Sequence, residues 1–308
     1  MTRDADAEAL VAGMRRAGVP ALHELGLDGA RQYLSAAASA GRPGPELEHV
    51  SDHDIPVGER VTRARVYRPT SATPLPTVVY AHGGGFVLGT LAASDAFCRR
   101  LADAARCLVI SVDYSLAPES PFPAAIDDVV AALHWAAANA ARWNGDPGRL
   151  VALGDSAGGG LVTVAVRKTL GSGPTVTRQI LAYPGVDLTG LTAGTDPHPY
   201  GTELPLTDPD RAWFRGLYVT EESMASDPDA APLLGDVTGM PPTTVLLGGC
   251  DPLSDEGLAY AQHLWRAGVS VDLHFYAGQI HGFLTLDDAI LPRASEALGV
   301  VSIAIANS

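Results

Sequence analysis

A serine between glycines is the feature of this sequence whose residue types most directly suggest catalysis. GDSAG at 154–158 is a G-x-S-x-G pattern, in which the serine lies on a sharp turn between a strand and a helix. An apolar run at 150–153 precedes the pattern, and a run typical of a helix follows at 157–170. Because the glycines permit the sharp turn, the hydroxyl of Ser156 would project as a nucleophile. The alternative interpretation is a serine that only caps a helix.

A glycine cluster that directly follows a strand is the second feature. HGGGF occupies 82–86, after a β-type run at 77–81. Glycines leave backbone N–H groups unshielded, and such groups can stabilise the negative charge of a tetrahedral intermediate. We expect the N–H groups of Gly83 and Gly84, with that of Ala157, to form an oxyanion hole. A phosphate-binding loop is disfavoured, because no Lys or Ser/Thr follows at the required spacing.

A serine nucleophile needs a base, which an acid must in turn orient. Asp251 follows the apolar run 243–247, and His281 follows the alternating run 269–275. The ends of strands carry the functional groups in such sheets, and the order serine, aspartate, histidine fits the G-x-S-x-G motif. We therefore predict a triad of Ser156, Asp251 and His281. The rival acids and bases are less well placed; they are Asp187, Asp255, Glu256, His263 and His274.

Metal ligands and disulfides are not expected. His49, Asp52, His53 and Asp54 are near one another in the sequence, but they fall in an early strand that we expect to be exposed, so no metal site and no cofactor is predicted. The three cysteines are odd in number and lack metal-ligand spacing, which predicts reduced, buried thiols in a cytoplasmic protein.

Strand and helix patterns alternate along most of the chain. Strands are expected at 60–67, 77–81, 107–112, 149–153, 179–183, 243–247 and 269–275, and helices at 5–14, 29–40, 94–105, 124–141, 157–170, 255–267 and from 292. This alternation predicts an α/β fold, a mostly parallel sheet with helices on both faces. It stops at 187–242, where we expect a cap insertion rather than a surface decoration. The expected domains are a catalytic domain of 46–186 and 243–308, the cap insertion 187–242, and N-terminal helices 1–45 that contribute to the cap.

The composition excludes several classes of function. The 308 residues are 46% hydrophobic and 18% charged, enough for a core and a sheltered pocket. Acidic residues outnumber basic ones 35 to 21, a net charge of −14, which argues against a nucleic-acid partner. No apolar run approaches the ~20 residues that span a bilayer, and the first residues lack the layout of a signal peptide.

Taken together, the motifs resemble the hormone-sensitive lipase family of α/β-hydrolases, the bacterial esterases with an HGGG motif. The motifs are HGGGF at 82–86, DYSLAPE at 113–119, FPA at 122–124, GDSAGG at 154–159, YPG at 183–185, DPLSDEG at 251–257 and HGF at 281–283. The resemblance implies an eight-stranded sheet with the second strand antiparallel, a helical cap and hydrolysis of carboxylic esters. It assigns the triad and the oxyanion roles to the same residues as above and makes a homodimer plausible. Ser115 and Ser254 depart from the family, which usually has arginine there.

The expected activity is that of a serine carboxylesterase that acts on small-molecule esters with short to medium acyl chains, through an acyl-enzyme intermediate. Candidate wall residues of the substrate pocket are Phe86, Tyr183, Phe214 and Leu217. Two alternatives remain open. The same triad could serve an amide or formamide hydrolase or an acyltransferase, and the same fold could serve a non-catalytic receptor for small molecules.

Overall fold

One eight-stranded sheet forms the centre of the computed structural model, which describes residues 2–190, 192 and 199–308. The strand order is β1-β2-β4-β3-β5-β6-β7-β8. β2 pairs antiparallel with both β1 and β4, and the remaining pairs are parallel. The predicted mostly parallel sheet with an antiparallel second strand is confirmed. The strands are β1 (His49–Val57), β2 (Arg60–Arg68), β3 (Leu75–Ala81), β4 (Leu108–Asp113), β5 (Gly145–Asp155), β6 (Val176–Ala182), β7 (Thr243–Cys250) and β8 (Val271–Ile280).

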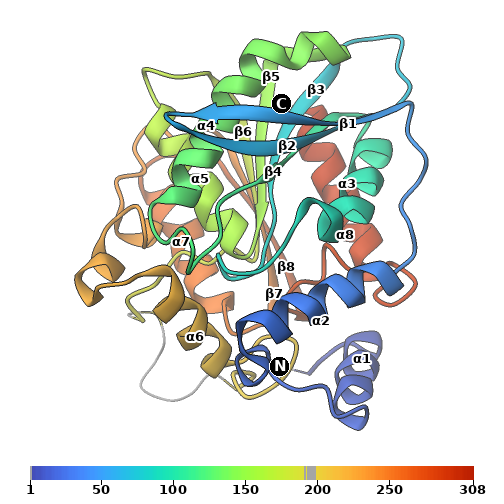
Figure 1. The fold of residues 1–308 in the computed structure, drawn as a ribbon, viewed down its shortest axis with the longest axis vertical. Coiled ribbons are helices and arrows are strands. Elements are labelled where there is room, and N and C mark those ends of the chain that lie inside the picture. Colours follow the sequence, from blue (N-terminus) through green and yellow to red (C-terminus); the bar gives the residue numbers. More distant parts are fainter. Residues whose placement is uncertain (1, 191, 193–198) are drawn as a thin grey trace.

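Helices cover both faces of this sheet, as the sequence predicts (Figure 1). α3 (Leu91–Ala105) and α8 (Arg293–Ala306) pack against each other on one face, and α4 (Ala124–Asn139), α5 (Ala157–Thr169) and α7 (Ser254–Arg266) lie on the other. Central strands between two layers of helices lose contact with water on both sides, and every residue of β3 is buried. Among the described residues, no helix is both long and apolar enough to cross a bilayer.

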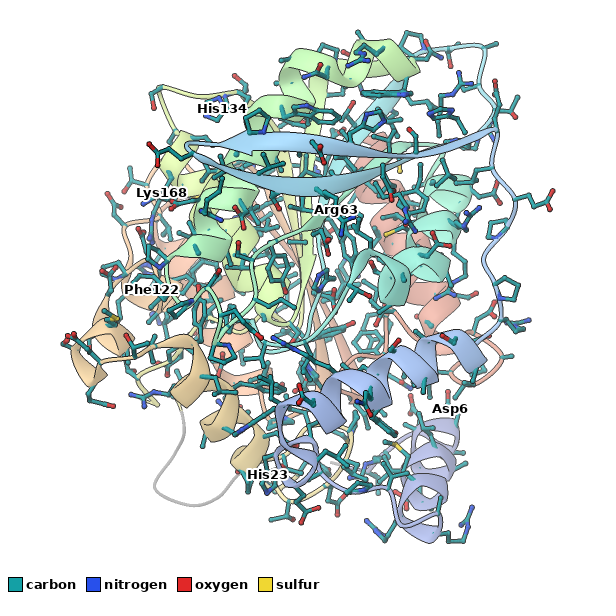
Figure 2. The ribbon with its side chains drawn as sticks, in the orientation of Figure 1. Asp6, His23, Arg63, Phe122, His134 and Lys168 are labelled. Atoms are coloured by element: carbon teal, nitrogen blue, oxygen red, sulfur yellow. The ribbon has the colours of Figure 1, made fainter. Side chains whose placement is uncertain are left out.

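The short 3-10 helix η2 (Ala140–Trp143) follows α4 and contacts β5, whereas the other remaining helices gather at one end of the sheet. They are α1 (Ala5–Arg16), the 3-10 helix η1 (Leu22–Leu25), α2 (Gly26–Ala40), α6 (Asp208–Tyr218), and the short 3-10 helices η3 (Glu222–Ser226) and η4 (Pro232–Leu234). In Figure 1, α1, α2 and α6 lie together there. His23 of η1, labelled in Figure 2, places its backbone N–H and its Nδ1 each 2.8 Å from Oδ1 of Asp210 in α6. The N-terminal segment and the 187–242 insertion are therefore in direct contact.

Several element boundaries differ from the sequence expectations. α3 begins at Leu91, three residues earlier than expected, because the side chain of Thr90 accepts the N–H of Ala93 and caps the helix there. β5 already begins at Gly145. β8 starts at Val271 and continues to Ile280, beyond Phe275, with an irregularity in its pairing to β7 that periodicity does not reveal.

Candidate active site

Ser156 lies on the predicted turn between β5 and α5. Its backbone φ of 53° and ψ of −123° are sparsely populated for a residue with a side chain. The neighbouring glycines make room for the turn, since a Cβ on Gly154 would come within 2.2 Å of the carbonyl oxygen of Gly158. A Cβ on Gly158 would lie 2.0 Å from the carbonyl oxygen of Ala81. The glycines of the motif therefore serve close approach of backbone segments, and the turn presents the serine hydroxyl.

The three residues predicted as a triad meet at this turn. His281 Nε2 lies 2.9 Å from Ser156 Oγ, and His281 Nδ1 lies 2.8 Å from Asp251 Oδ2. With the proton on Nδ1, the imidazole donates to the carboxylate and accepts from the hydroxyl. Asp251 is fully buried, and its other oxygen accepts the backbone N–H of Leu253 at 2.8 Å. This geometry allows the serine proton to pass to the imidazole while the carboxylate fixes the ring.

The rival acids and bases lie elsewhere. Asp187 accepts hydrogen bonds from Thr189 and Thr192, and His263 contacts the carbonyl oxygen of Gly235. His274 pairs with Asp272 on β8. Asp255 and Glu256 form no hydrogen bond with His281 in the part of the chain that the structure describes.

The loop of the HGGG motif is fastened to the nucleophile turn by Asp155. Its Oδ1 accepts the hydroxyl of Tyr80 at 2.6 Å and the backbone N–H of Gly83 at 2.9 Å. Burial raises the pKa of this carboxyl, and the two hydrogen bonds oppose the shift. The structure thus gives the N–H of Gly83 to Asp155 and not to the expected oxyanion hole. The free N–H groups, those of Gly84, Gly85 and Ala157, have no acceptor among the described residues.

His82 supports the same loop from behind. Its ring stacks on Tyr114 with 4.4 Å between centroids, and its Nδ1 lies 2.8 Å from the carbonyl oxygen of Gly83. The hydroxyl of Tyr114 donates to the carbonyl oxygen of His82 at 2.7 Å. Burial lowers the pKa of His82, so the ring is neutral near neutral pH and holds the loop by shape and hydrogen bonds.

A cavity of about 900 Å³ opens in front of Ser156. Phe86 and Phe214, both predicted as wall residues, line it. The ring of Phe214, on α6, lies directly over Gly85, where an added Cβ would come within 2.3 Å of that ring. Phe86 stacks on Tyr218 with 4.0 Å between centroids. Helix α6 therefore forms the wall of the cavity that faces the free N–H groups.

Two other predicted wall residues do not line the cavity. Tyr183 is fully buried, and its ring lies 4.9 Å from that of His281, so it supports the histidine from within the core. Leu217 is partly buried and packs against the core cluster. Tyr183 belongs to the YPG motif and Leu217 to α6, which is why both were predicted as wall residues. The direction of their side chains depends on packing that the sequence does not show.

A partly buried ion pair that the sequence did not predict lines the polar side of the cavity. Glu256 of α7 accepts the N–H groups of Val186 and Asp187 at 2.8 and 3.2 Å, and Arg211 of α6 at 2.8 Å. Burial raises the pKa of Glu256 to about 7, although Arg211 opposes the shift. The pair joins α6 to α7, and Glu256 lies five residues after Asp251.

An arginine from another strand lies beside Ser115. Arg60, on β2, lies 2.9 Å from Ser115 Oγ and 3.1 Å from Oδ1 of the fully buried Asp128. The backbone N–H of Ser115 donates to the other oxygen of Asp128 at 2.7 Å. The buried carboxylate of Asp128 is thus paired with the guanidinium of Arg60 from β2. Nothing in the structure explains the serine at 254.

The early histidines form a network of their own. His49 Nε2 and His53 Nε2 each lie 2.7 Å from Ser51 Oγ, and Asp52 pairs with Arg65 on the other face of β1. Within 2–190, 192 and 199–308, no three His, Cys, Asp or Glu side chains are grouped so as to hold a metal ion.

Comparison with known proteins places the chain in a family. A family model described as alpha/beta hydrolase fold matches residues 78–285. The chain is 38% identical over 265 residues to the carboxylic ester hydrolase LipN of Mycobacterium tuberculosis, covering 83% of this chain and 70% of LipN. It is 36% identical over 305 residues to the ethyl acetate hydrolase of Pseudomonas putida, covering 95% and 94%. The solved structure of a hyperthermophilic esterase from Pyrobaculum calidifontis superposes with a TM-score of 0.89 at 34% identity, covering 99% and 98% of the two chains. The chain therefore belongs to the α/β-hydrolase fold family, and the resemblance of its motifs to the hormone-sensitive lipase family is confirmed.

Proposed function

We propose that this protein is a serine carboxylesterase that hydrolyses small esters with short to medium acyl chains through an acyl-enzyme intermediate. The observation that carries the proposal is the continuous series of hydrogen bonds from Ser156 through His281 to the buried Asp251. The names of the related esterases from three organisms support an ester substrate over an amide.

The proposed reaction has two steps. His281 Nε2 takes the proton of Ser156 as the serine oxygen attacks the ester carbonyl, and the resulting imidazolium then protonates the leaving alcohol. A water molecule, deprotonated by the same histidine, attacks the acyl-enzyme and releases the acid. Asp251 holds the ring and stabilises its charged form. The free N–H groups of Gly84, Gly85 and Ala157 are the donors that would stabilise the oxyanion in both steps.

The substrate range follows from the cavity and from the segments that enclose it. We propose that the N-terminal helices (1–45) and the insertion (187–242) form one cap above a catalytic domain made of 46–186 and 243–308. The contact of His23 with Asp210 supports a single unit, and Phe214 brings this unit over Gly85. A cavity of about 900 Å³ with phenylalanine walls suits uncharged acyl groups of modest length.

A series of p-nitrophenyl esters from acetyl to dodecanoyl, assayed with the wild type and with Ser156→Ala, tests the proposal. We expect activity that is highest at short to medium chains and disappears in the variant. Activity that rises steadily to dodecanoyl would contradict the chain-length range. A folded wild type without activity on any ester would overturn the esterase proposal and favour the amide hydrolase or the receptor.

Partners and location belong to the same proposal. β8 is an edge strand, and the exposed Leu273, Phe275 and Ile303 lie on it and on α8. This surface suits a homodimer in which two β8 edges pair, and a monomeric mass in light scattering at all concentrations would contradict it. The three cysteines are free and buried, which supports the cytoplasm as the site of action, and the net charge of −14 argues against nucleic acid. Cell fractionation and a nucleic-acid binding assay test these two points.

A further inference from the structure

The end of β8 carries His281, and its pairing with β7 is irregular. The regular register ends at Gly248 with Tyr276, and the next pair is Cys250 with Ile280. The residues between Tyr276 and Ile280 therefore need other contacts to fix their position. Gln279, two residues before His281, is fully buried.

Cys250 Sγ lies 3.6 Å from the carbonyl oxygen of Ala277, and an N-terminal residue supplies the polar contacts of Gly278 and Gln279. The backbone N–H of Asp4 donates to the carbonyl oxygen of Gly278 at 3.0 Å, and Oδ2 of Asp4 accepts Nε2 of Gln279 at 2.9 Å. Asp4 packs so closely that a Cβ on Gly278 would lie 2.3 Å from its Oδ1. The other amide atom of Gln279, Oε1, is buried without a hydrogen-bond partner in the described part of the chain. Asp4 is thus the polar anchor of this buried amide.

The side chain of Asp4 does not cap α1, although its position before the helix would suggest that it does. Asp4 is the N-cap residue of α1, and aspartate at an N-cap usually accepts an N–H group of the first helical turn. Here it makes no such bond, because its carboxylate is turned to Gln279. Capping of α1 and the contact with Gln279 can therefore be tested separately, because removal of the Asp4 carboxylate takes no capping hydrogen bond from α1.

The segment that bears Asp4 is itself held by the insertion. Arg3 forms an ion pair with Glu203, and its guanidinium lies 5.1 Å from the ring centroid of Tyr200. The Arg3 side chain is 7% exposed. A hydrogen bond with Cys250, the residue before Asp251, raises the pKa of Tyr200. Arg3 and Asp4 thus reach the segments that precede both Asp251 and His281.

We propose that Asp4 is a positioning residue, which holds the end of β8 through Gln279 and Gly278 so that His281 stays within hydrogen-bond distance of Ser156 and Asp251. This inference rests on the proposed esterase function. Asp4 touches neither the substrate cavity nor His281, so its loss should slow the chemical steps without changing the cavity that binds the ester. Small displacements of a catalytic group can lower a rate by up to about 10²-fold.

The test compares Asp4→Ala with Asp4→Asn and with Asp6→Ala. Asn retains an oxygen that accepts the amide of Gln279. Asp6, labelled on α1 in Figure 2, accepts the N–H of Ala7 and has no hydrogen bond to β8 among the described residues. We expect Asp4→Ala to lower kcat about tenfold with KM nearly unchanged. Asp4→Asn should restore most of kcat, and Asp6→Ala should equal the wild type.

A second readout separates positioning from a general loss of folded protein. A looser His281–Asp251 contact stabilises the imidazolium less, so the acidic limb of the pH–rate profile should move to lower pH in Asp4→Ala. Gln279→Met removes the same contact from the other side, so it should lower kcat and shift the acidic limb of the pH–rate profile as much as Asp4→Ala does. The double variant should have a kcat no lower than that of either single variant.

The outcomes are distinct. An active wild type with unchanged kcat and pH profile in both Asp4→Ala and Gln279→Met would overturn the positioning role and leave the esterase proposal intact. A fall in kcat that merely tracks the folded fraction, with an unmoved acidic limb, would also overturn it. A folded wild type without esterase activity would instead mean that the proposed function itself has failed.

Discussion

Asp155 is the residue whose removal should lower both the stability of the protein and its catalytic rate. In Asp155→Ala, the hydroxyl of Tyr80 and the N–H of Gly83 both lose their acceptor; Tyr80 is buried and Gly83 is partly buried. A hydrogen bond to a charged group contributes about 1.5–3 kcal/mol, but burial raises the pKa of Asp155, so part of this gain is offset by desolvation. We expect the free energy of unfolding to fall by about 2–4 kcal/mol, which for a chain of 308 residues lowers Tm by about 3–6 °C.

The effect on catalysis should be larger than the effect on Tm suggests. Gly83 precedes the free N–H groups of Gly84 and Gly85, so its release misplaces the donors of the oxyanion hole. The loss of one such donor typically costs about 10²–10³ in kcat, and we expect Asp155→Ala to reach about 10² with KM little changed.

Tyr80→Phe is the matched control for Asp155→Ala. It removes one of the two hydrogen bonds but leaves that of Gly83, so it should lower stability by about 1–2 kcal/mol and leave kcat near that of the wild type. The assay is steady-state hydrolysis of p-nitrophenyl butanoate together with urea unfolding. Wild-type kcat in Asp155→Ala would refute the reasoning, as would an equal loss of kcat in Tyr80→Phe.

Three further predictions concern the surroundings of the site. Arg60→Ala leaves the buried carboxylate of Asp128 without its cation, and because Arg60 is partly exposed we expect the free energy of unfolding in urea to fall by only about 1–2 kcal/mol. Ser115→Arg in that background should restore the lost stability, and no recovery would contradict the idea that Arg60 does the work of an arginine at 115. Burial raises the pKa of Glu256 to about 7. Between the ordinary pKa of a glutamate and about pH 7, the native state therefore keeps a proton that the unfolded state releases, and the free energy of unfolding falls as pH rises through this range. Glu256→Gln should therefore flatten the fall in unfolding free energy between about pH 5 and 7, by about 2–3 kcal/mol, whereas an unchanged slope would mean that other groups cause it. Phe214→Ala should shift the preferred acyl chain to longer esters by opening the wall over the oxyanion loop, and an unchanged ranking of kcat/KM across the ester series would show that this ring does not limit the chain.

Periodicity and motif spacing were sufficient for the sheet, for most helices and for the three residues that meet at the turn. Ser156, Asp251 and His281 each follow a strand, and the parallel order of β5, β7 and β8 brings these strand ends to one edge. Local patterns specify strands and turns well, because the alternation of side chains and the demands of a sharp turn are local properties. The predicted break in the pattern at 187–242 likewise corresponds to a segment with α6 and short 3-10 helices.

Long-range contacts were not predictable in the same way. Which glycine N–H groups remain free depends on the side chain of Asp155, 72 residues after Gly83. The contact of Asp4 with Gln279 joins residues 275 positions apart. Neither contact can be recognised from composition or spacing. Each depends on how the helices and strands pack together and on which buried polar group still lacks a hydrogen-bond partner.

In the proposed reaction, Ser156 is the group that becomes acylated. Incubation with a p-nitrophenyl phosphonate, followed by intact-protein and peptide mass spectrometry, tests it most directly. We expect one phosphonyl group per chain, on Ser156, with release of an equal amount of p-nitrophenol, loss of esterase activity, and no adduct in Ser156→Ala. An adduct on another residue, or full esterase activity in a chain labelled at Ser156, would contradict it.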